Sequence, residues 1–386
     1  MDMPAAPRRH CFELVTETYP PEINGVALTV QSLHDGLIAL GHEVGLVRPA
    51  RPGEPVDEEA ALLRVDGAPI PRYPGMRFGL PAGRRLMARW QRRRPDAIYI
   101  ATEGPLGWSA LRAAKRLGIP VATGFHTRFD DYVGRYGAAF LSPWVFAWLR
   151  RFHNRADATL VPTRQLAEEL AQAGFGKVQR LGRAVDTRRF DPRFRSEALR
   201  QQWGLAGDGL AIIHVGRLAP EKNLPLLLRC FERLRAERPG SRLVLVGDGP
   251  ARAALAQQHP EIIFTGTLRG EALATHFASA DLFCFPSLSE TFGNVTLEAM
   301  ASAVCTVAFD YGAAREHLVD GVHGASVPFG NEPAFLERFL ATALSGQHAA
   351  MGQAARTAVE RLSPERVSRD FADLLASLIP ATRRAA

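Results

Sequence analysis

The chain has 386 residues, of which 46% are hydrophobic and 23% charged. This length exceeds what one hydrophobic core usually serves, so it predicts two domains. The sequence contains no apolar stretch of the about 18 residues that cross a bilayer, and residues 1–10 lack the apolar segment of a signal peptide, so we expect a cytoplasmic protein without a transmembrane helix.

Cysteine and lysine are both sparse. The four cysteines have apolar neighbours and no Cys-x-x-Cys spacing, which indicates reduced core residues rather than disulfides or zinc ligands: Cys11, Cys230, Cys284 and Cys305. Among 47 basic residues, three are lysines: Lys115, Lys177 and Lys222. The net charge of +7 belongs mainly to residues 1–180, which hold 24 basic and 18 acidic side chains.

Short apolar runs alternate with helical patterns through the first half of the chain. The run at 11–15 is followed by a loop rich in Pro, Asn and Gly, and then by a helix whose apolar residues recur every three or four positions until Gly41. Further strands are predicted at 44–47, 97–100, 121–125 and 159–161. This alternation is typical of a doubly wound parallel sheet.

Two segments of this half combine basic and apolar residues. Residues 84–94 hold six arginines around Leu86 and Trp90, and this helix either turns its apolar side to the core or lies on an anionic membrane. Residues 140–151 place Trp144 and Trp148 four positions apart before two arginines. These tryptophans form either the buried face of a helix or a surface that contacts a membrane.

The alternation stops at residues 183–209, a polar and arginine-rich stretch that we interpret as a linker. It resumes with strands predicted at 210–215, 243–246, 262–264, 282–285 and 304–309. A last helix is predicted to begin at Ser363 and Pro364. The second half is therefore also α/β, and ligands are expected in the loops after its strands.

One such loop, residues 287–300, holds two carboxylates eight positions apart. Glu290 lies in the loop and Glu298 about one turn into the following helix, where both can accept hydrogen bonds from a polyhydroxylated ligand such as a sugar. The start of this helix offers the backbone N–H groups of Phe292, Gly293 and Asn294. The alternative is that Glu290 interacts only with the helix dipole and Glu298 is a surface residue.

A second loop, residues 216–223, places Arg217 and Lys222 between a strand and a helix. Two cations beside a helix N-terminus can bind a pyrophosphate, because Arg gives planar bidentate hydrogen bonds and Lys a mobile point charge. The alternative is an ordinary loop with solvated charges. The chain contains no Asp-x-Asp pair to hold a metal at such a diphosphate, so its own cations would neutralise it.

Four motifs occur together along the chain: YPPEINGV at 19–26, Gly216-Arg217 with EKN at 221–223, VGDGP at 246–250, and the Glu290–Glu298 pair. In this combination the chain resembles the family-four retaining glycosyltransferases of the GT-B fold along nearly its whole length. Residues 124–130, 152–155 and 182–186 are most similar to the branch that glycosylates membrane lipids and includes GDP-mannose-dependent α-mannosyltransferases.

The resemblance implies roles for the matching positions of the second half. Arg217 and Lys222, beside Gly216, would hold the donor diphosphate and stabilise the charge that develops on it. Glu298 would accept hydrogen bonds from the ribose hydroxyls. Glu290, together with the backbone amides of Phe292, Gly293 and Asn294, would hold the transferred sugar.

The resemblance also implies roles in the first half. Asn24 and Gly25 would border the donor, with Gly25 leaving room for it. His126 would face the sugar near its reacting carbon. The implied architecture is two Rossmann-like domains facing a cleft: an acceptor-binding domain at 1–184, a nucleotide-sugar-binding domain at 185–362, and a C-terminal helix at 363–386 that packs on the first domain.

The implied reaction is transfer of a hexose with retention, mannose from GDP-mannose being our first choice, to a hydroxyl of a membrane glycolipid. We expect no metal, no other cofactor and no nucleic-acid partner, and a location on the cytoplasmic face of the inner membrane. Three alternatives are a UDP-sugar-dependent lipid glucosyl- or glucuronosyltransferase, a sugar-nucleotide epimerase, and a non-catalytic basic protein that binds membranes or nucleic acid. The last leaves Glu290 and Glu298 unexplained.

Overall fold

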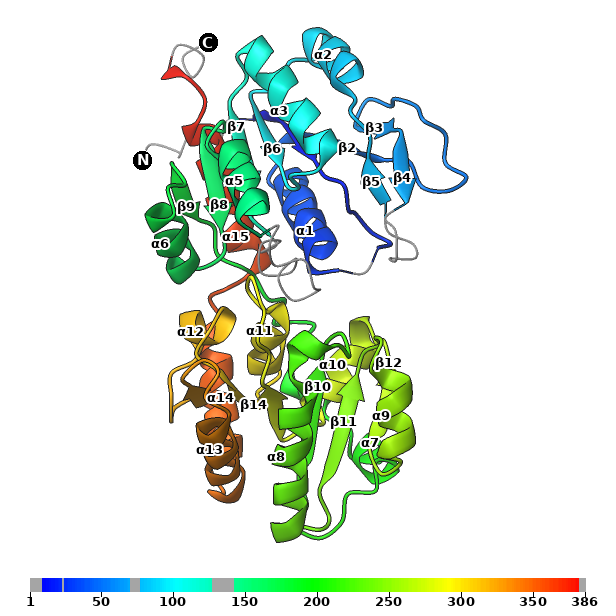
Figure 1. Cartoon of the computed structure of the whole chain (residues 1–386), viewed down its shortest axis with the longest axis vertical. Coiled ribbons are helices and arrows are strands. Elements are labelled where there is room, and N and C mark those ends of the chain that lie inside the picture. The colour runs from blue at the N-terminus through cyan, green and yellow to red at the C-terminus, as the bar shows by residue number, and fades with distance from the viewer. Residues whose placement is uncertain (1–8, 23, 70–76, 127–141, 382–386) are drawn as a thin grey trace, which may run out of the picture. The chain divides into compact units, whose positions relative to one another are not determined.

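The computed structural model describes residues 9–22, 24–69, 77–126 and 142–381. The chain divides into two compact units (Figure 1). Unit 1 combines Met1–Gly182 with Pro364–Ala386, and unit 2 is Arg183–Ser363. These divisions lie within two residues of the boundaries expected at 184 and 363.

Unit 1 is built on a seven-stranded parallel sheet with the order β3-β2-β1-β6-β7-β8-β9. Its strands are β1 (Cys11–Val15), β2 (Glu43–Pro49), β3 (Leu62–Val65), β6 (Ala97–Ile100), β7 (Val121–Gly124), β8 (Ala158–Val161) and β9 (Val178–Arg180), and a separate hairpin joins β4 (Gly67–Pro69) to β5 (Arg77–Gly79). Its helices are α1 (Gly25–Ala39), α2 (Gly83–Arg92), α3 (Pro105–Leu117), α5 (Ser142–His153), α6 (Arg164–Gln172) and α15 (Pro364–Ser377). The strand order reverses between β1 and β6, and this is where doubly wound sheets bind ligands.

Helix α15 packs against α1 within unit 1 (Figure 1). A Cβ atom placed on Gly36 of α1 would lie 1.9 Å from Ser368 Oγ, so the missing side chain lets the two helices approach closely. Phe371 of α15 also packs edge-on against Tyr99 of β6, with 5.0 Å between the ring centroids. The last helix is therefore part of the core of unit 1.

Unit 2 is built on a six-stranded parallel sheet with the order β12-β11-β10-β13-β14-β15. Its strands are β10 (Ala211–Val215), β11 (Arg242–Val246), β12 (Ile263–Gly266), β13 (Leu282–Phe285), β14 (Cys305–Phe309) and β15 (Gly324–Val327). Its helices are η3 (Pro192–Phe194), α7 (Glu197–Gln202), η4 (Pro220–Lys222), α8 (Leu224–Glu237), α9 (Arg252–Gln258), α10 (Gly270–Ala278), α11 (Asn294–Ala301), α12 (Ala313–His317), α13 (Glu332–Leu344) and α14 (His348–Val359). Here the strand order reverses between β10 and β13.

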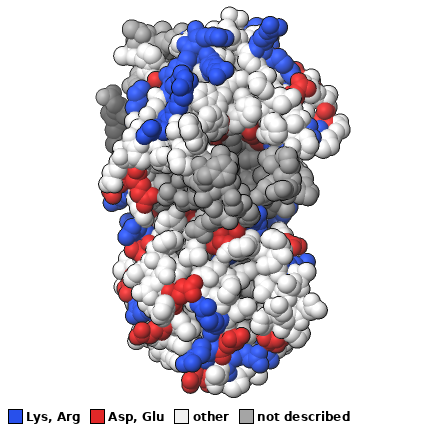
Figure 2. All heavy atoms as spheres, in the orientation of Figure 1, with Lys and Arg blue, Asp and Glu red and all other residues white. Residues whose placement is uncertain are grey.

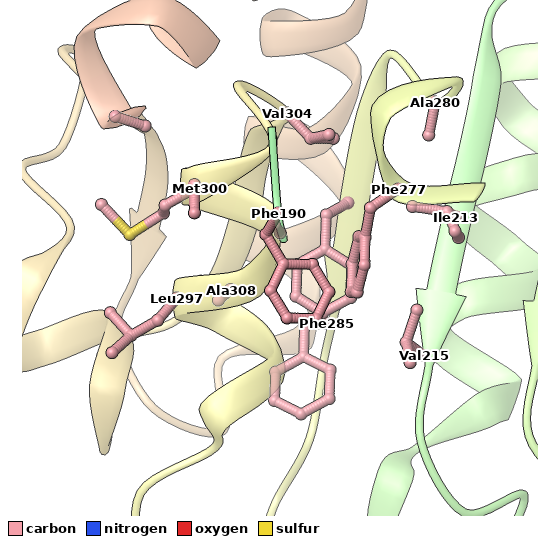
Figure 3. Close-up of a cluster of buried hydrophobic side chains, with 14 of the residues drawn as sticks. Phe190, Ile213, Val215, Phe277, Ala280, Phe285, Leu297, Met300, Val304 and Ala308 are labelled. Carbon is pink, nitrogen blue, oxygen red and sulfur yellow. The ribbon is translucent and has the colours of Figure 1, made fainter. Parts of the chain in front are cut away.

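The prediction that residues 183–209 form a linker is wrong. Phe190 and Trp203 are 7% and 6% exposed and belong to the core of unit 2. Figure 3 shows Phe190 beside Phe277, together with Met300 from α11. The rings of Phe190 and Phe277 pack edge-on with 6.0 Å between their centroids. This stretch therefore covers one side of the second sheet.

The arginine-rich helix α2 turns its apolar side inward, as in the first of the two interpretations. Leu86 and Trp90 are fully buried. Arg89 is also buried, and its Nε donates to Glu13 of β1 at 2.9 Å. Arg92 and Arg93 form ion pairs with acidic side chains of neighbouring segments. None of the described helices has the length and apolar character needed to span a membrane.

Candidate active site

The two loops singled out in the second half meet at one edge of the unit 2 sheet. One follows β10 and the other follows β13, the two strands between which the strand order reverses. The N–H of Leu288 donates to the carbonyl of Glu221 at 2.9 Å, and the hydroxyl of Ser287 lies 3.4 Å from the same carbonyl oxygen. These contacts therefore join the two loops to each other at the position where doubly wound sheets bind ligands.

Lys222 and Glu290 form an ion pair across these two loops. Their side chains are 13% and 16% exposed, which strengthens the attraction relative to a surface pair. The hydroxyl of Ser287 donates to Glu290 at 2.8 Å, and Lys222 Nζ lies 5.2 Å from the ring centroid of Phe285. The ammonium is thus held over the end of β13.

Arg217 lies in the same loop as Lys222 and is paired with Glu221. Its Nε and one terminal nitrogen donate to the same carboxylate oxygen at 3.1 and 2.8 Å. The Arg217 side chain is 37% exposed, so its guanidinium is accessible to a ligand. The loop after β10 therefore carries two cations, and each forms an ion pair with a carboxylate.

The start of α11 offers unpaired backbone donors beside this loop pair. Gly293 has a φ of 89°, a left-handed conformation that favours glycine, and it turns the chain into the helix. Within the described part of the chain, no carbonyl or side chain accepts a hydrogen bond from the N–H groups of Phe292, Gly293 and Asn294. An anionic or hydroxyl oxygen can bind there, favoured by the helix dipole.

Glu298, in the second turn of α11, has a carboxylate without a hydrogen-bond or ion-pair partner among the described residues. The residue is half-buried. Burial raises the pKa of this carboxyl to about 7, while the charge of Arg189 opposes the shift. Hydroxyl donors would favour its ionised form, so the position suits a ligand with vicinal hydroxyls such as a ribose.

In unit 1, Asn24 has a structural role that the sequence reading missed. Its Oδ1 accepts from the N–H of Ala27 at 2.8 Å and caps α1, and its Nδ2 donates to Thr18 Oγ1 at 2.7 Å. Gly25 is the first residue of α1, and a Cβ atom added there meets no atom within 4 Å. Among the described residues of unit 1, neither packing nor backbone conformation therefore requires glycine at position 25.

His126 follows β7 and is partly exposed. Its Nε2 lies 2.7 Å from the hydroxyl of Tyr99, which fixes the ring beside the neighbouring strand β6. The remainder of the 124–130 motif begins with Thr127 and lies outside the described residues.

A buried polar cluster at the same edge of the unit 1 sheet was not predicted. His153 Nδ1 lies 2.8 Å from Thr123 Oγ1, and its Nε2 lies 3.2 Å from a carboxylate oxygen of Glu103. Nearby, Glu17 accepts from the N–H of Leu106 at 3.0 Å and caps α3. Glu17 and Glu103 lie two and three residues after the ends of β1 and β6, and Thr123 lies near the end of β7; this placement was the signal available in the sequence.

Comparisons with known proteins identify the family. The model of Glycosyltransferase Family 4 matches residues 23–189, and the model of glycosyl transferases group 1 matches residues 209–343. A GDP-mannose-dependent alpha-mannosyltransferase of Mycolicibacterium smegmatis is 37% identical over 309 residues, covering 78% of this chain and 80% of the relative. This chain belongs to the family-four glycosyltransferases.

A further relative agrees with this assignment, and a solved structure shares the fold. Sulfoquinovosyl transferase SQD2 of Arabidopsis thaliana is 34% identical over 280 residues, covering 70% of this chain and 54% of that protein. Sucrose-phosphate synthase from Thermosynechococcus elongatus superposes with a TM-score of 0.74 at 19% identity, covering 96% of this chain and 99% of that one. The chain is thus a hexosyltransferase with the GT-B fold, which favours glycosyl transfer over the epimerase and non-catalytic alternatives.

Proposed function

We propose that this glycosyltransferase moves mannose from GDP-mannose, with retention of configuration, to a hydroxyl of a lipid-type acceptor. Three relatives that are 33% to 37% identical are named GDP-mannose-dependent alpha-mannosyltransferases. The acceptor class is supported by an alpha-monoglucosyldiacylglycerol synthase of Streptococcus pneumoniae, 26% identical over 352 residues. We further propose that unit 2 binds the donor and unit 1 the acceptor.

The observation that carries the proposal is the joined pair of loops with Arg217, Lys222 and Glu290. In the proposed reaction the donor diphosphate replaces the carboxylates as the ion-pair partner of Lys222 and Arg217. Glu290 is then able to accept hydrogen bonds from hydroxyls of the sugar. As the glycosidic bond breaks, negative charge grows on the diphosphate and both cations stabilise it, which is charge stabilisation that a metal provides elsewhere.

Retention follows if the acceptor oxygen attacks the anomeric carbon from the face that the nucleotide leaves. The bond from carbon to the phosphate oxygen breaks, the bond to the acceptor oxygen forms, and the departing phosphate takes the acceptor's proton. This route needs no nucleophile from the protein. His126 of unit 1 is proposed to face the sugar, and Gly25 to leave room for the donor.

Thermal-shift measurements with GDP, UDP, ADP and their sugars test the donor assignment, because a ligand that binds only the native state raises the melting temperature. We expect the largest shift with GDP and GDP-mannose. A larger shift with UDP and its sugars would favour the UDP-sugar-dependent alternative. Turnover is expected to persist in EDTA, and a full loss that magnesium or manganese restores would contradict cation catalysis by the protein alone.

A lipid acceptor also requires contact with its membrane, and the α3–α5 surface of unit 1 suits this. Trp144 and Trp148 are 77% and 41% exposed, so they do not form the buried face of their helix. Trp148 packs 5.8 Å from Trp108 of α3, and the guanidinium carbons of Arg112 and Arg155 lie 5.6 and 5.5 Å from that ring. Figure 2 shows basic side chains gathered on this end of unit 1. We propose that this surface binds anionic lipid.

Flotation with liposomes tests this surface. The wild type should float with vesicles that contain phosphatidylglycerol more than with neutral vesicles. A variant with Trp144→Ser and Arg151→Ser, which changes two exposed residues of α5, should float less. Leu344→Ser is the control, because Leu344 is 41% exposed and lies in unit 2. Arg92 and Arg93 are unsuitable targets, since their substitution would break ion pairs of unit 1. Equal and negligible flotation of wild type and variant with both vesicles would contradict membrane binding.

A further inference from the structure

His214 lies in β10, two residues before the loop of Arg217 and Lys222 begins its turn, and it is fully buried. Its Nδ1 lies 3.0 Å from the carbonyl oxygen of Cys284 in the neighbouring strand β13. A carbonyl oxygen only accepts, so Nδ1 must carry the ring proton. The other nitrogen, Nε2, is therefore a hydrogen-bond acceptor.

This acceptor has no partner in the described part of the chain, although almost no solvent reaches it. Buried polar atoms are rarely left unpaired in native structures, so an unpaired one needs an explanation. The pKa of His214 also indicates that Nε2 carries no proton. Burial lowers it to about 4, with the Cys284 carbonyl opposing and the Lys222 charge adding to the shift. The ring is neutral at physiological pH and its lone pair is available.

The unpaired nitrogen faces the space next to Lys222. A Cβ atom placed on Gly216 would lie 3.7 Å from His214 Nε2 and 3.6 Å from Lys222 Cε, so both side chains border the same space. Phe285 flanks both groups: its ring centroid is 5.7 Å from that of His214 and 5.2 Å from Lys222 Nζ. The flexible stem of Lys222 can carry its ammonium from Glu290 toward Nε2 by rotation of its own side chain.

We propose that His214 is a positioning residue. It accepts a hydrogen bond from the ammonium of Lys222 when Glu290 binds hydroxyls of the donor sugar instead of Lys222. The inference rests on the proposed role of Lys222 at the diphosphate. An ammonium has three protons, so one can be given to the imidazole while the others remain for phosphate oxygens. A neutral acceptor fixes the direction of Lys222 without cancelling its charge, whereas a carboxylate would reduce the charge available to the leaving group.

Two substitutions separate this role from a structural one. In His214→Asn, the side-chain amide nitrogen occupies the place of Nδ1 and keeps the bond to Cys284 but removes the acceptor near Lys222. In His214→Gln, the amide oxygen reaches the place of Nε2 and keeps that acceptor but loses the bond to Cys284. We expect His214→Asn to lower kcat about tenfold with little change in donor KM, and His214→Gln to retain most of the activity.

The reverse order, with His214→Asn active and His214→Gln impaired, would show that only the bond to Cys284 matters and would overturn the proposal. Equal activity of the two variants would overturn it as well. Donor binding is measured separately by the thermal shift with nucleoside diphosphates. If the wild type shows no such shift, the proposed function fails. If it shows the shift and the two variants do not differ, only the role of His214 fails.

A measurement on the unsubstituted imidazole avoids any dependence on the folding of variants. In protein labelled with ¹⁵N-histidine, we expect the Nε2 resonance of His214 to move on addition of donor sugar nucleotide, because a free lone pair becomes hydrogen-bonded. The same addition to Lys222→Ala should leave this resonance in place. An unchanged resonance in donor-saturated wild type, or the same change in Lys222→Ala, would overturn the proposal.

Discussion

Lys222 and Glu290 lie 68 positions apart in the sequence and form a partly buried ion pair between the loops after β10 and β13. The ammonium of Lys222, which is proposed to bind the diphosphate, is thus already paired with the carboxylate of Glu290 before the donor binds. The pair holds Lys222 in place without a ligand, and donor binding must replace one partner of Lys222 by another. Removing either partner should therefore affect chemistry more than folding.

We expect Lys222→Ala and Arg217→Ala each to lower turnover about a hundredfold, because each removes stabilisation of about 3 kcal/mol from the charge on the leaving diphosphate. Steady-state kinetics and melting temperatures measure the two effects separately. Lys115→Ala is the matched control, since Lys115 forms an ion pair with Asp157 on the surface of unit 1. Near-normal turnover in either active-site variant would remove that residue from the site.

The pH dependence of nucleotide binding should follow Glu298. Its pKa is raised to about 7 in the ligand-free protein, and ribose hydroxyls bind the ionised form better, so affinity for nucleoside diphosphate should rise as the pH increases from about 6 to 8. Calorimetric titration at several pH values measures this slope. In Glu298→Gln the slope should disappear, and an equal slope in both proteins would contradict the assignment.

The raised pKa of Glu298 also affects the ligand-free fold, with the opposite sign. The folded state holds this proton more tightly than the unfolded state. The contribution of Glu298 to the free energy of unfolding therefore decreases as the pH rises from the ordinary carboxyl pKa of 4.5 to about 7. Denaturant titrations of wild type and Glu298→Gln at the two ends of this range measure the difference.

Gly25→Val should abolish transfer while leaving the melting temperature nearly unchanged. Apart from its two chain neighbours, no described residue has an atom within 4 Å of the added Cβ, so the expected loss of activity comes from a clash with the donor. Gly83→Val is a matched control, because Gly83 is likewise the first residue of a helix and has an equally open surrounding. Full activity of Gly25→Val would contradict a donor contact at this position.

Gly104→Ala should destabilise unit 1. The added Cβ would lie 2.0 Å from Glu17 Oε2, so Glu17 must leave its place at the start of α3. The backbone at Gly104 has a φ of −67°, which alanine adopts freely, so the expected loss of about 1 to 3 kcal/mol comes from this displacement. A double-mutant cycle with Glu17→Ala checks the cause, since the penalty should largely vanish when Glu17 is absent.

The sequence was sufficient to place the two main loops of the site together. Their strands are short buried runs separated by helical patterns, and parallel strands of that kind end at one edge of a sheet. Glu290 and Lys222 could thus be assigned to the same edge without coordinates. Their direct ion pair, and the bond from Leu288 to Glu221, depend on loop conformations that no periodic pattern records.

Other features depend on contacts between distant segments. Phe190 and Trp203 lie in a polar stretch that shows no continuous strand or helix pattern, so the sequence alone did not mark them as core residues. Arg89 is buried because Glu13, 76 positions away, neutralises it. The unpaired nitrogen of His214 is visible only once the tautomer is fixed by Cys284. Composition and spacing describe neighbours along the chain, whereas these properties depend on neighbours in space.

The packing of α15 on α1 has a consequence for synthesis of the protein. On the ribosome, the seven strands of the main sheet of unit 1 emerge before any part of unit 2. Phe371 and Leu375, which complete the same core cluster as Leu33, emerge only after residues 183–363. Until then, the part of the apolar surface of α1 and β6 that α15 buries remains exposed to solvent. The nascent N-terminal unit therefore has to remain soluble, with an incomplete core, throughout translation of the other unit.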